Sequence, residues 1–196
     1  MNYILKNVTI VDSDVTLKQH TTDIEITNGV ITKIEKNISS NDDFKNIDLE
    51  NLHVSQGWFD TSVSLGEPGF EQRETIINGL NVAAKSGFTG IALQPNSYPT
   101  IDNQAQINFV QTKGQNQATS LFPIGALTKN SEGKDLAELF DMKNAGAVAF
   151  GDFNKNIDNA NILKIALQYT QEFDGLIISF CQDPNIKGIG IAHEGI

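Results

Sequence analysis

The chain has 196 residues, of which 39% are hydrophobic and 19% are charged. This length suffices for one or two domains with a buried core. The formal net charge is −10, because 24 acidic residues outweigh 14 lysines and arginines. An acidic surface disfavours nucleic acid and anionic lipid as partners. The single cysteine, Cys181, excludes a disulfide framework and a cysteine-based zinc cluster.

No apolar run is long enough for a membrane helix, and the first residues lack the basic and apolar regions of a signal peptide. We therefore expect a chain that works in the reducing cytoplasm, with neither a membrane nor a nucleic acid as its partner. The three histidines, His20, His53 and His193, lie far apart in the sequence, and a lone histidine does not define a site.

Residues 1–55 alternate apolar and polar side chains in the manner of strands. Strands are predicted over 3–5, 8–11, 23–26, 30–34, 47–49 and 53–54, with a loop over 39–46. Asn28-Gly29 predicts a tight hairpin turn, because both residues favour positive φ. Together these elements predict a small β module.

Residues 56–196 alternate strands with helices instead. Strands are predicted over 58–63, 89–93, 119–126, 147–150 and 176–180, and helices over 71–86, 104–113, 136–144 and 159–173. Apolar strands separated by helices of this length are typical of a parallel sheet. The predicted organisation is therefore a β domain over 1–55, followed by five strands and four helices over 56–196.

Two α/β architectures fit this second region. A complete eight-stranded barrel needs about 250 residues, which is more than 56–196 supplies. Five parallel strands form either a small open doubly wound domain or the first half of a barrel. The second alternative accounts for the lack of a predicted helix that would cover the edge of the last strand.

Several separate blocks of sequence carry a resemblance to a known family. They are Gly57 to Gly69, Gly87-Phe88-Thr89 with Gln94-Pro95-Asn96, Gly146 to Phe150, and Cys181 to Asn185. In order and spacing they resemble the dihydroorotase branch of the amidohydrolase superfamily, and the resemblance covers essentially the whole chain. It implies the first half of a TIM-type (β/α)8 amidohydrolase barrel, preceded by a small β-sandwich module.

The resemblance also implies that this chain has lost a metal site. The family pattern on the first barrel strand is Asp-x-His-x-His-Leu-Arg-Glu-Pro-Gly, and Ser62 and Ser64 occupy its two histidine positions. Gly66 occupies the position of the arginine that holds the substrate carboxylate, and Phe180 that of a metal-binding histidine after the fifth strand. A hydroxyl is a poor zinc ligand, a phenyl ring has no lone pair, and glycine has no charge.

Three positions that hold site residues in the family are retained. Asp60 matches the acid that opens the pattern, Asn96 an asparagine that contacts substrate, and Asp152 a carboxylate that bridges metals in some members. We expect the two acids to hydrogen-bond within the end of the barrel rather than to bind metal. Zinc is expected in active relatives, whereas this chain is expected to have no cofactor and no catalytic residue.

Three functions follow from these matches. The first is a non-catalytic dihydroorotase-like protein of pyrimidine biosynthesis that serves as a structural partner of aspartate transcarbamoylase. The second is an active cyclic-amide hydrolase of the dihydroorotase, hydantoinase or allantoinase type, with a relocated metal site built from Asp60, Asp152 and His193 together with ligands from the remaining half of the barrel. The third is a small-molecule-binding module. We expect the remaining half of the barrel and further copies of the chain as partners.

Among the other candidate residues, His53 is predicted to be a surface or hydrogen-bonded histidine, and Cys181 a small buried apolar residue.

Overall fold

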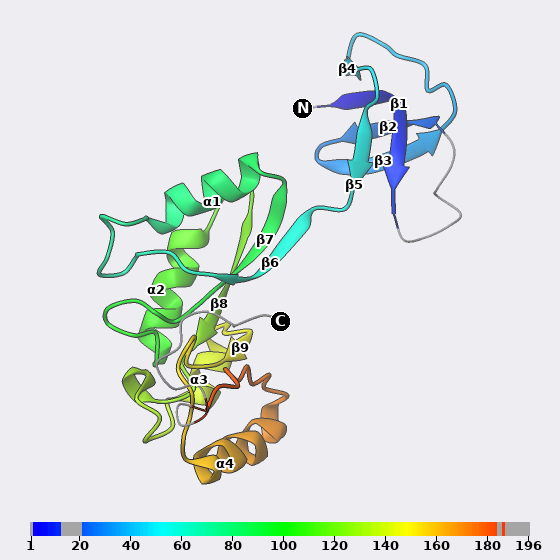
Figure 1. The fold of residues 1–196 in the computed structure, drawn as a ribbon. Helices are drawn as coiled ribbons and strands as arrows, with labels where there is room; N and C mark the ends of the chain where they lie inside the picture. Colours follow the sequence, from blue (N-terminus) through cyan, green and yellow to red (C-terminus); the bar gives the residue numbers. More distant parts are fainter. Residues whose placement is uncertain (1, 13–20, 184–185, 187–196) are drawn as a thin grey trace, which may run out of the picture. The chain divides into compact units, whose positions relative to one another are not determined.

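The computed structural model describes residues 2–12, 21–183 and 186 (Figure 1). It divides into two compact units, Met1–Gly57 and Trp58–Ile196. Among the helices of the described residues, none is long and apolar enough to cross a membrane.

The first unit is a five-stranded sheet in the order β3-β2-β1-β4, with β5 also paired to β1. Its strands are β1 (Tyr3–Val11), β2 (Thr21–Thr27), β3 (Val30–Glu35), β4 (Lys45–Asp48) and β5 (His53–Ser55). β1, β2 and β3 are antiparallel, whereas β4 and β5 run parallel to β1. The predicted Asn28-Gly29 turn is confirmed, with φ angles of 52° and 81°.

Two predictions for this unit were wrong. The strands predicted over 3–5 and 8–11 are one strand, whose register shifts between Leu5 and Val8. Asn7 lies within this irregularity at a φ of 53°. The irregularity interrupts the alternation of apolar and polar side chains, so that one strand has the sequence pattern of two. The predicted loop over 39–46 ends early, because Lys45 and Asn46 already pair with β1.

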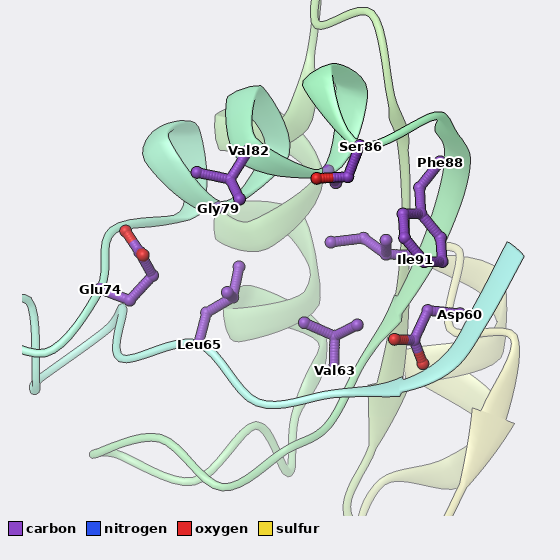
Figure 2. A pocket seen from close by; sticks show the side chains of 10 residues that line it. Asp60, Val63, Leu65, Glu74, Gly79, Val82, Ser86, Phe88 and Ile91 are labelled. Carbon is purple, nitrogen blue, oxygen red and sulfur yellow. The ribbon is translucent and has the colours of Figure 1, made fainter. Parts of the chain in front are cut away.

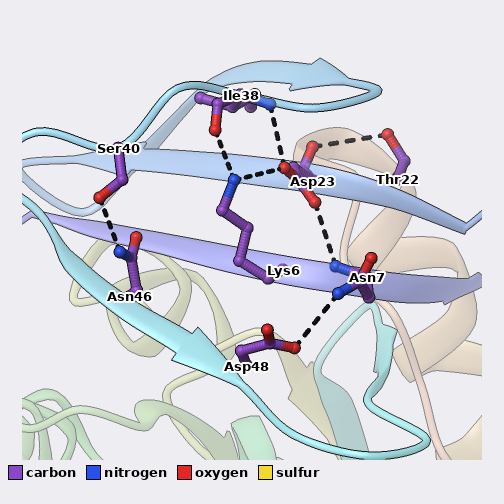
Figure 3. Close-up of polar contacts among 8 residues, drawn as sticks. All are labelled: Lys6, Asn7, Thr22, Asp23, Ile38, Ser40, Asn46 and Asp48. Carbon is purple, nitrogen blue, oxygen red and sulfur yellow. Dashed lines mark hydrogen bonds and ion pairs between the residues drawn. The ribbon is translucent and has the colours of Figure 1, made fainter.

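A buried ionic network holds the irregular part of β1 (Figure 3). The carboxylate of Asp23 accepts hydrogen bonds from the Asn7 N–H at 3.0 Å and the Ile38 N–H at 2.9 Å, and pairs with Lys6 Nζ at 2.7 Å. Lys6 also donates to the Ile38 carbonyl. One carboxylate thus connects β1, β2 and the segment after β3.

The second unit contains a four-stranded parallel sheet in the order β6-β7-β8-β9. Its strands are β6 (Trp58–Val63), β7 (Phe88–Leu93), β8 (Ser120–Gly125) and β9 (Ala149–Phe150). Its helices are α1 (Ile76–Lys85), α2 (Gln104–Gly114), α3 (Leu139–Asn144) and α4 (Ala160–Thr170). Strands and helices alternate, and α1 and α2 lie side by side along the sheet (Figure 1). The predicted half-barrel is confirmed.

The two faces of this sheet belong to different apolar clusters. Ile91 and Leu93 of β7 join the main core, which includes Ile76 and Leu80 of α1. Ala92, between them on β7, joins a separate cluster with residues of β8 and β9. This division follows from the alternation of side chains along a strand. The second cluster therefore marks the face of the sheet opposite the helices.

The boundaries of α1 correct the predicted helix over 71–86. Thr75 is its N-cap and accepts a hydrogen bond from the Asn78 N–H at 3.2 Å, and Gly87 ends it at a φ of 87°. Residues 71–73 form a turn before the helix. The turn and the residues up to the N-cap are all polar, and the apolar spacing begins only at Ile76, the first residue of the helix.

Three further predictions need correction. The helix predicted over 136–144 starts only at Leu139, because Leu136 forms an antiparallel bridge with Thr128. The helix predicted over 159–173 is α4 followed by a 3-10 turn over Gln171–Phe173. The fifth strand, predicted over 176–180, is reduced to one parallel bridge between Ile177 and Phe150.

The Asp23 network generates a prediction about acid stability. Burial by itself raises the pKa of Asp23, but the hydrogen bonds from Lys6, Asn7 and Ile38 outweigh it and hold the pKa below its ordinary value of 3.8. As the pH falls, the Asp23 carboxylate is therefore protonated in the unfolded chain before it is protonated in the folded one. The contribution of this carboxylate to the free energy of unfolding is complete above about pH 4 and is lost in more acidic solution.

Replacement Asp23→Asn is expected to lower the free energy of unfolding by about 1–3 kcal/mol at pH 7 and to reduce its acid dependence. Urea denaturation at several pH values measures both effects. Asp48→Asn is the matched control, because the exposed Asp48 accepts one hydrogen bond from Asn7 in the same sheet. Equal losses for the two variants would contradict this account.

Candidate functional site

Two hydroxyl–amide pairs join the carboxyl ends of β6 and β7. The side-chain amide of Gln94 donates to Ser62 Oγ at 3.2 Å, and that of Asn96 donates to Ser64 Oγ at 2.7 Å. Both pairs join residues 32 positions apart, as the parallel register of β6 and β7 favours. The two serines at the predicted histidine positions therefore hydrogen-bond to neighbouring amides.

Gln94 was missed as a site residue in the sequence. It lies two positions before Asn96, directly after a predicted strand, just as Ser62 lies two positions before Ser64. That equal spacing at the ends of adjacent parallel strands is the signal that could have identified the pair. Gln94 is buried, with 6% of its surface exposed, so its amide is held in a fixed position.

Ser62 and Phe180 line a common pocket of about 340 Å³ at the carboxyl ends of the strands. The structure thus brings together two of the three predicted ligand positions, although they are far apart in the sequence. The third, Ser64, lies outside the lining of this pocket.

Asp60 is separated from the serines. The register of β6 against β7 shifts between Asp60 and Val63, and Asp60 lines a different pocket of about 240 Å³, between β6 and α1. Figure 2 shows Asp60, Val63 and Leu65 around this largely apolar pocket, beneath α1. Asp60 Oδ1 accepts a hydrogen bond from the Ser62 N–H at 2.9 Å, so its contact with the predicted site is through the backbone.

Asp152 is buried and hydrogen-bonded to the protein. The residue is 4% exposed, and its carboxylate accepts hydrogen bonds from the N–H groups of Leu127 and Thr128, each at 3.0 Å, and from the Thr128 hydroxyl. These bonds fasten the segment after β9 to the segment after β8. The acid therefore stabilises two connecting segments.

Asn96 lies in the same neighbourhood as Asp152. Both residues line a pocket of about 190 Å³. The Asn96 amide nitrogen donates to Ser64, whereas its buried oxygen Oδ1 has no hydrogen-bond partner among the described residues.

Gly66 lies in a loop too tight for any side chain. A Cβ atom at this position would lie 2.0 Å from the Phe70 carbonyl oxygen and 2.8 Å from that of Glu74. Backbone hydrogen bonds hold the same approach, from the Phe70 N–H to Gly66 O and from the Gly66 N–H to Glu74 O. The path of the loop therefore excludes an arginine at position 66. To match the family pattern, the chain would need a different loop backbone as well as a different residue.

Glu67 anchors this loop and was not identified in the sequence. Its side chain is buried and pairs with Lys113 Nζ of α2 at 2.7 Å, and it accepts a hydrogen bond from the Ile76 N–H at 2.9 Å. Glu67 thus holds the beginning of α1 and the loop through Gly66 against α2. The negative charge of Glu67 is paired with Lys113.

The isolated histidines and the cysteine lie apart from the pockets or outside the described residues. His193 and His20 both lie outside the described residues. His53 belongs to the first unit, where it is exposed and its Nδ1 lies 2.6 Å from the Asn51 carbonyl oxygen. Cys181 is exposed, so the expectation of a buried apolar residue was wrong; the strand predicted to bury it ends in a single bridge.

Among the described residues, the donor set does not fit a resident zinc ion. Within residues 2–12, 21–183 and 186, no group of three or more histidine, cysteine or acidic side chains is placed to hold a metal. Ser62 and Ser64 are hydrogen-bonded to amides, and the Asp152 carboxylate is occupied by backbone and hydroxyl donors.

The half-barrel with a site at the strand ends places the second unit in the amidohydrolase fold. The L-hydantoinase (dihydropyrimidinase) of Arthrobacter aurescens superposes with a TM-score of 0.71 at 22% identity, over 89% of this chain and 39% of that one. A crystal structure of a dihydroorotase gives a TM-score of 0.64 at 13% identity, over 90% of this chain and 50% of the other.

Sequence relatives identify the family more narrowly. The model of the Dihydro-orotase-like family matches residues 53–196, and the chain belongs to that family. It is 40% identical over 195 residues to the dihydroorotase of Pelotomaculum thermopropionicum and 36% identical over 196 residues to that of Ruminiclostridium cellulolyticum. It spans 45% of the length of each of these relatives.

The tight loop generates a prediction about Gly66. Gly66→Ala is expected to lower the free energy of unfolding by about 3 kcal/mol or more, because two backbone carbonyls must move. Gly133→Ala is the control within the same unit. Its φ is 70° but the nearest atom to a Cβ there is 3.9 Å away, so only backbone strain of about 1 kcal/mol is expected. Thermal unfolding of both variants compares them, and a smaller loss for Gly66→Ala would contradict the account.

Proposed function

We propose that this chain is a non-catalytic, dihydroorotase-like protein of pyrimidine biosynthesis. The observation that most supports the proposal is the pairing of Ser62 and Ser64 with Gln94 and Asn96. These serines stand where the family resemblance implies two imidazole ligands. Phe180, at a third ligand position, has no lone pair to offer.

The chemistry explains why these changes matter together. In a metal-dependent hydrolase the metal lowers the pKa of a bound water and so supplies hydroxide near neutral pH. In place of imidazole or carboxylate ligands, the side chains that line the 340 Å³ pocket carry hydroxyl, amide, alkyl and phenyl groups. The Gly66 loop also leaves no room for the arginine that would hold a substrate carboxylate. Metal binding and substrate binding are thus both affected.

A structural role requires a surface that partners can bind. In the second unit, exposed apolar side chains lie at both edges of the sheet, on β6 and beside β9. Trp58 and Phe59 of β6 are exposed, as are Leu176 and Ile178 beside β9. Exposed apolar patches commonly mark protein contacts, and among the described strands β6 pairs only with β7. These surfaces support the proposed partners: the remaining half of a barrel, further copies of the chain, and aspartate transcarbamoylase.

The proposal places the protein in the cytoplasm, as the single cysteine favours.

The competing hypothesis of an active cyclic-amide hydrolase needs Asp60 and Asp152 at one metal. Those residues line different pockets.

Zinc content and turnover test the proposal. The purified full-length protein, incubated with zinc, dialysed against zinc-free buffer and analysed by inductively coupled plasma mass spectrometry, is expected to hold less than about 0.1 zinc per chain. It is also expected not to cyclise carbamoyl aspartate. The dihydroorotase of Pelotomaculum thermopropionicum, prepared in parallel, is the positive control for both assays. Stoichiometric zinc together with turnover that is lost in Asp152→Ala would favour the active hydrolase and end the proposal.

The partnership has a separate test. Mixed with the catalytic chain of aspartate transcarbamoylase from the same source, the protein is expected to co-elute in size-exclusion chromatography. Trp58→Ala is expected to weaken the complex about tenfold or more, because buried aromatic residues dominate interface energies. Tyr98→Ala, which alters an aromatic residue as exposed as Trp58 but on a loop, is the matched control. Separate elution of the two wild-type proteins would refute the partnership.

A further inference from the structure

We propose that Asn28, at the tip of the β2–β3 hairpin, is a site of spontaneous deamidation, and that the fold protects the same dipeptide in α1. The sequence contains two Asn-Gly pairs, Asn28-Gly29 and Asn78-Gly79. In both, the residue after the asparagine has no Cβ, so nothing on that residue shields its backbone nitrogen. The inference is independent of the proposed function, because it concerns the chemistry of the first unit.

The reaction consumes one water and releases one ammonia. The backbone nitrogen of the glycine loses its proton to base and attacks Cγ of the asparagine, so that a new C–N bond forms. The bond from Cγ to Nδ2 breaks, ammonia leaves, and the product is a cyclic succinimide. Water then opens the ring at either of its two carbonyls and gives aspartate or isoaspartate. Nothing is oxidised or reduced, so the modification needs no cofactor.

The reacting groups are free at the hairpin tip. Among the described residues, neither the Asn28 side chain nor the Gly29 N–H has a hydrogen-bond partner, and only the backbone N–H of Asn28 is held, by Asn2 Oδ1 at 3.2 Å. No atom lies within 4 Å of where a Cβ of Gly29 would stand. Exposed loop tips also open at low cost in free energy. The nitrogen of Gly29 can therefore reach Cγ of Asn28 without breaking a hydrogen bond of either group.

The same groups are held in α1. Asn78 is exposed, as Asn28 is, so access to water does not distinguish the two asparagines. The Asn78 amide donates to Glu74 Oε1 at 2.9 Å, and the Gly79 N–H donates to the Thr75 carbonyl oxygen at 3.0 Å. Both the electrophile and the nucleophile must therefore leave a hydrogen bond before they can react.

Deamidation at Asn28 would change both the backbone and the charge of the hairpin. Thr27 and Val30 pair directly across the turn, and isoaspartate routes the backbone through an extra carbon between them. A two-residue turn of altered length does not preserve the register of its strands. Asn28 also lines an open pocket of about 520 Å³ with Asp42 and Asp43, so the new carboxylate adds a third negative charge there. We therefore expect the modified hairpin to be less stable.

Ageing of the whole chain at mildly alkaline pH, followed by peptide mapping with mass spectrometry, tests the inference. Cleavage after lysine and arginine gives a peptide of residues 19–33, in which Asn28 is the only asparagine, and one of residues 74–85, which holds Asn78 and Asn81. Fragmentation distinguishes the two asparagines of the second peptide. In the native protein, Asn28 is expected to convert at least about tenfold faster than Asn78, because Asn78 must first lose two hydrogen bonds.

The unfolded chain is the control for intrinsic reactivity. In concentrated urea, the two asparagines are expected to convert at similar rates, since the fold no longer distinguishes them. Equal rates in the native protein would overturn the inference. Conversion of both asparagines in urea, with Asn28 intact in the native protein over the same period, would overturn it as well.

Two further measurements test the role of the fold. Thr75→Ala removes the N-cap of α1, and is expected to raise the conversion rate of Asn78 about threefold or more while that of Asn28 is unchanged. An unchanged rate at Asn78 would refute protection by the helix. Hydrogen exchange of the isoaspartyl fraction is expected to be faster in β2 and β3 than in the unmodified protein, with β7 as the internal control. Equal exchange in both fractions would refute the effect on the hairpin.

Discussion

The parallel register between β6 and β7 is the constraint on which the site depends. It sets the residues after β6 beside those after β7, so that Ser62 meets Gln94 and Ser64 meets Asn96. Hydroxyl–amide pairs at these positions satisfy groups that would otherwise face a pocket unpaired. The family pattern has two histidines in place of these serines, at a spacing of two residues that favours the same side of a strand. Under the proposed function, the fold is retained while the chemistry at the strand ends differs from that of the family pattern.

The loop after β6 reinforces that change. Gly66 packs backbone against backbone, and Glu67 is committed to Lys113 and to the start of α1. An arginine at position 66, as in the family pattern, would thus require a different loop path. Asp152, which the family resemblance matches to a metal-bridging acid of some members, fastens two connecting segments together in this structure.

Much of this fold could be predicted from the sequence, because its strands and most of its helices have clear periodicity. β6 matches its predicted bounds, and α2 extends one residue beyond them. The errors arose where tertiary contacts override local pattern: Leu136 forms a bridge instead of a helical turn, and residues 176–180 make one bridge instead of a strand. The shift in β6 that separates Asp60 from Ser62 and the Gly66 clash depend on backbone geometry that no residue pattern expresses.

The most direct test of the central claim is a crystal structure of the protein grown with excess zinc, with diffraction recorded at the zinc absorption edge. The account predicts no anomalous peak within bonding distance of Ser62, Ser64 or Asp152, with the Gln94 and Asn96 amides still on the two hydroxyls. An ordered zinc ion bound by those residues would contradict it.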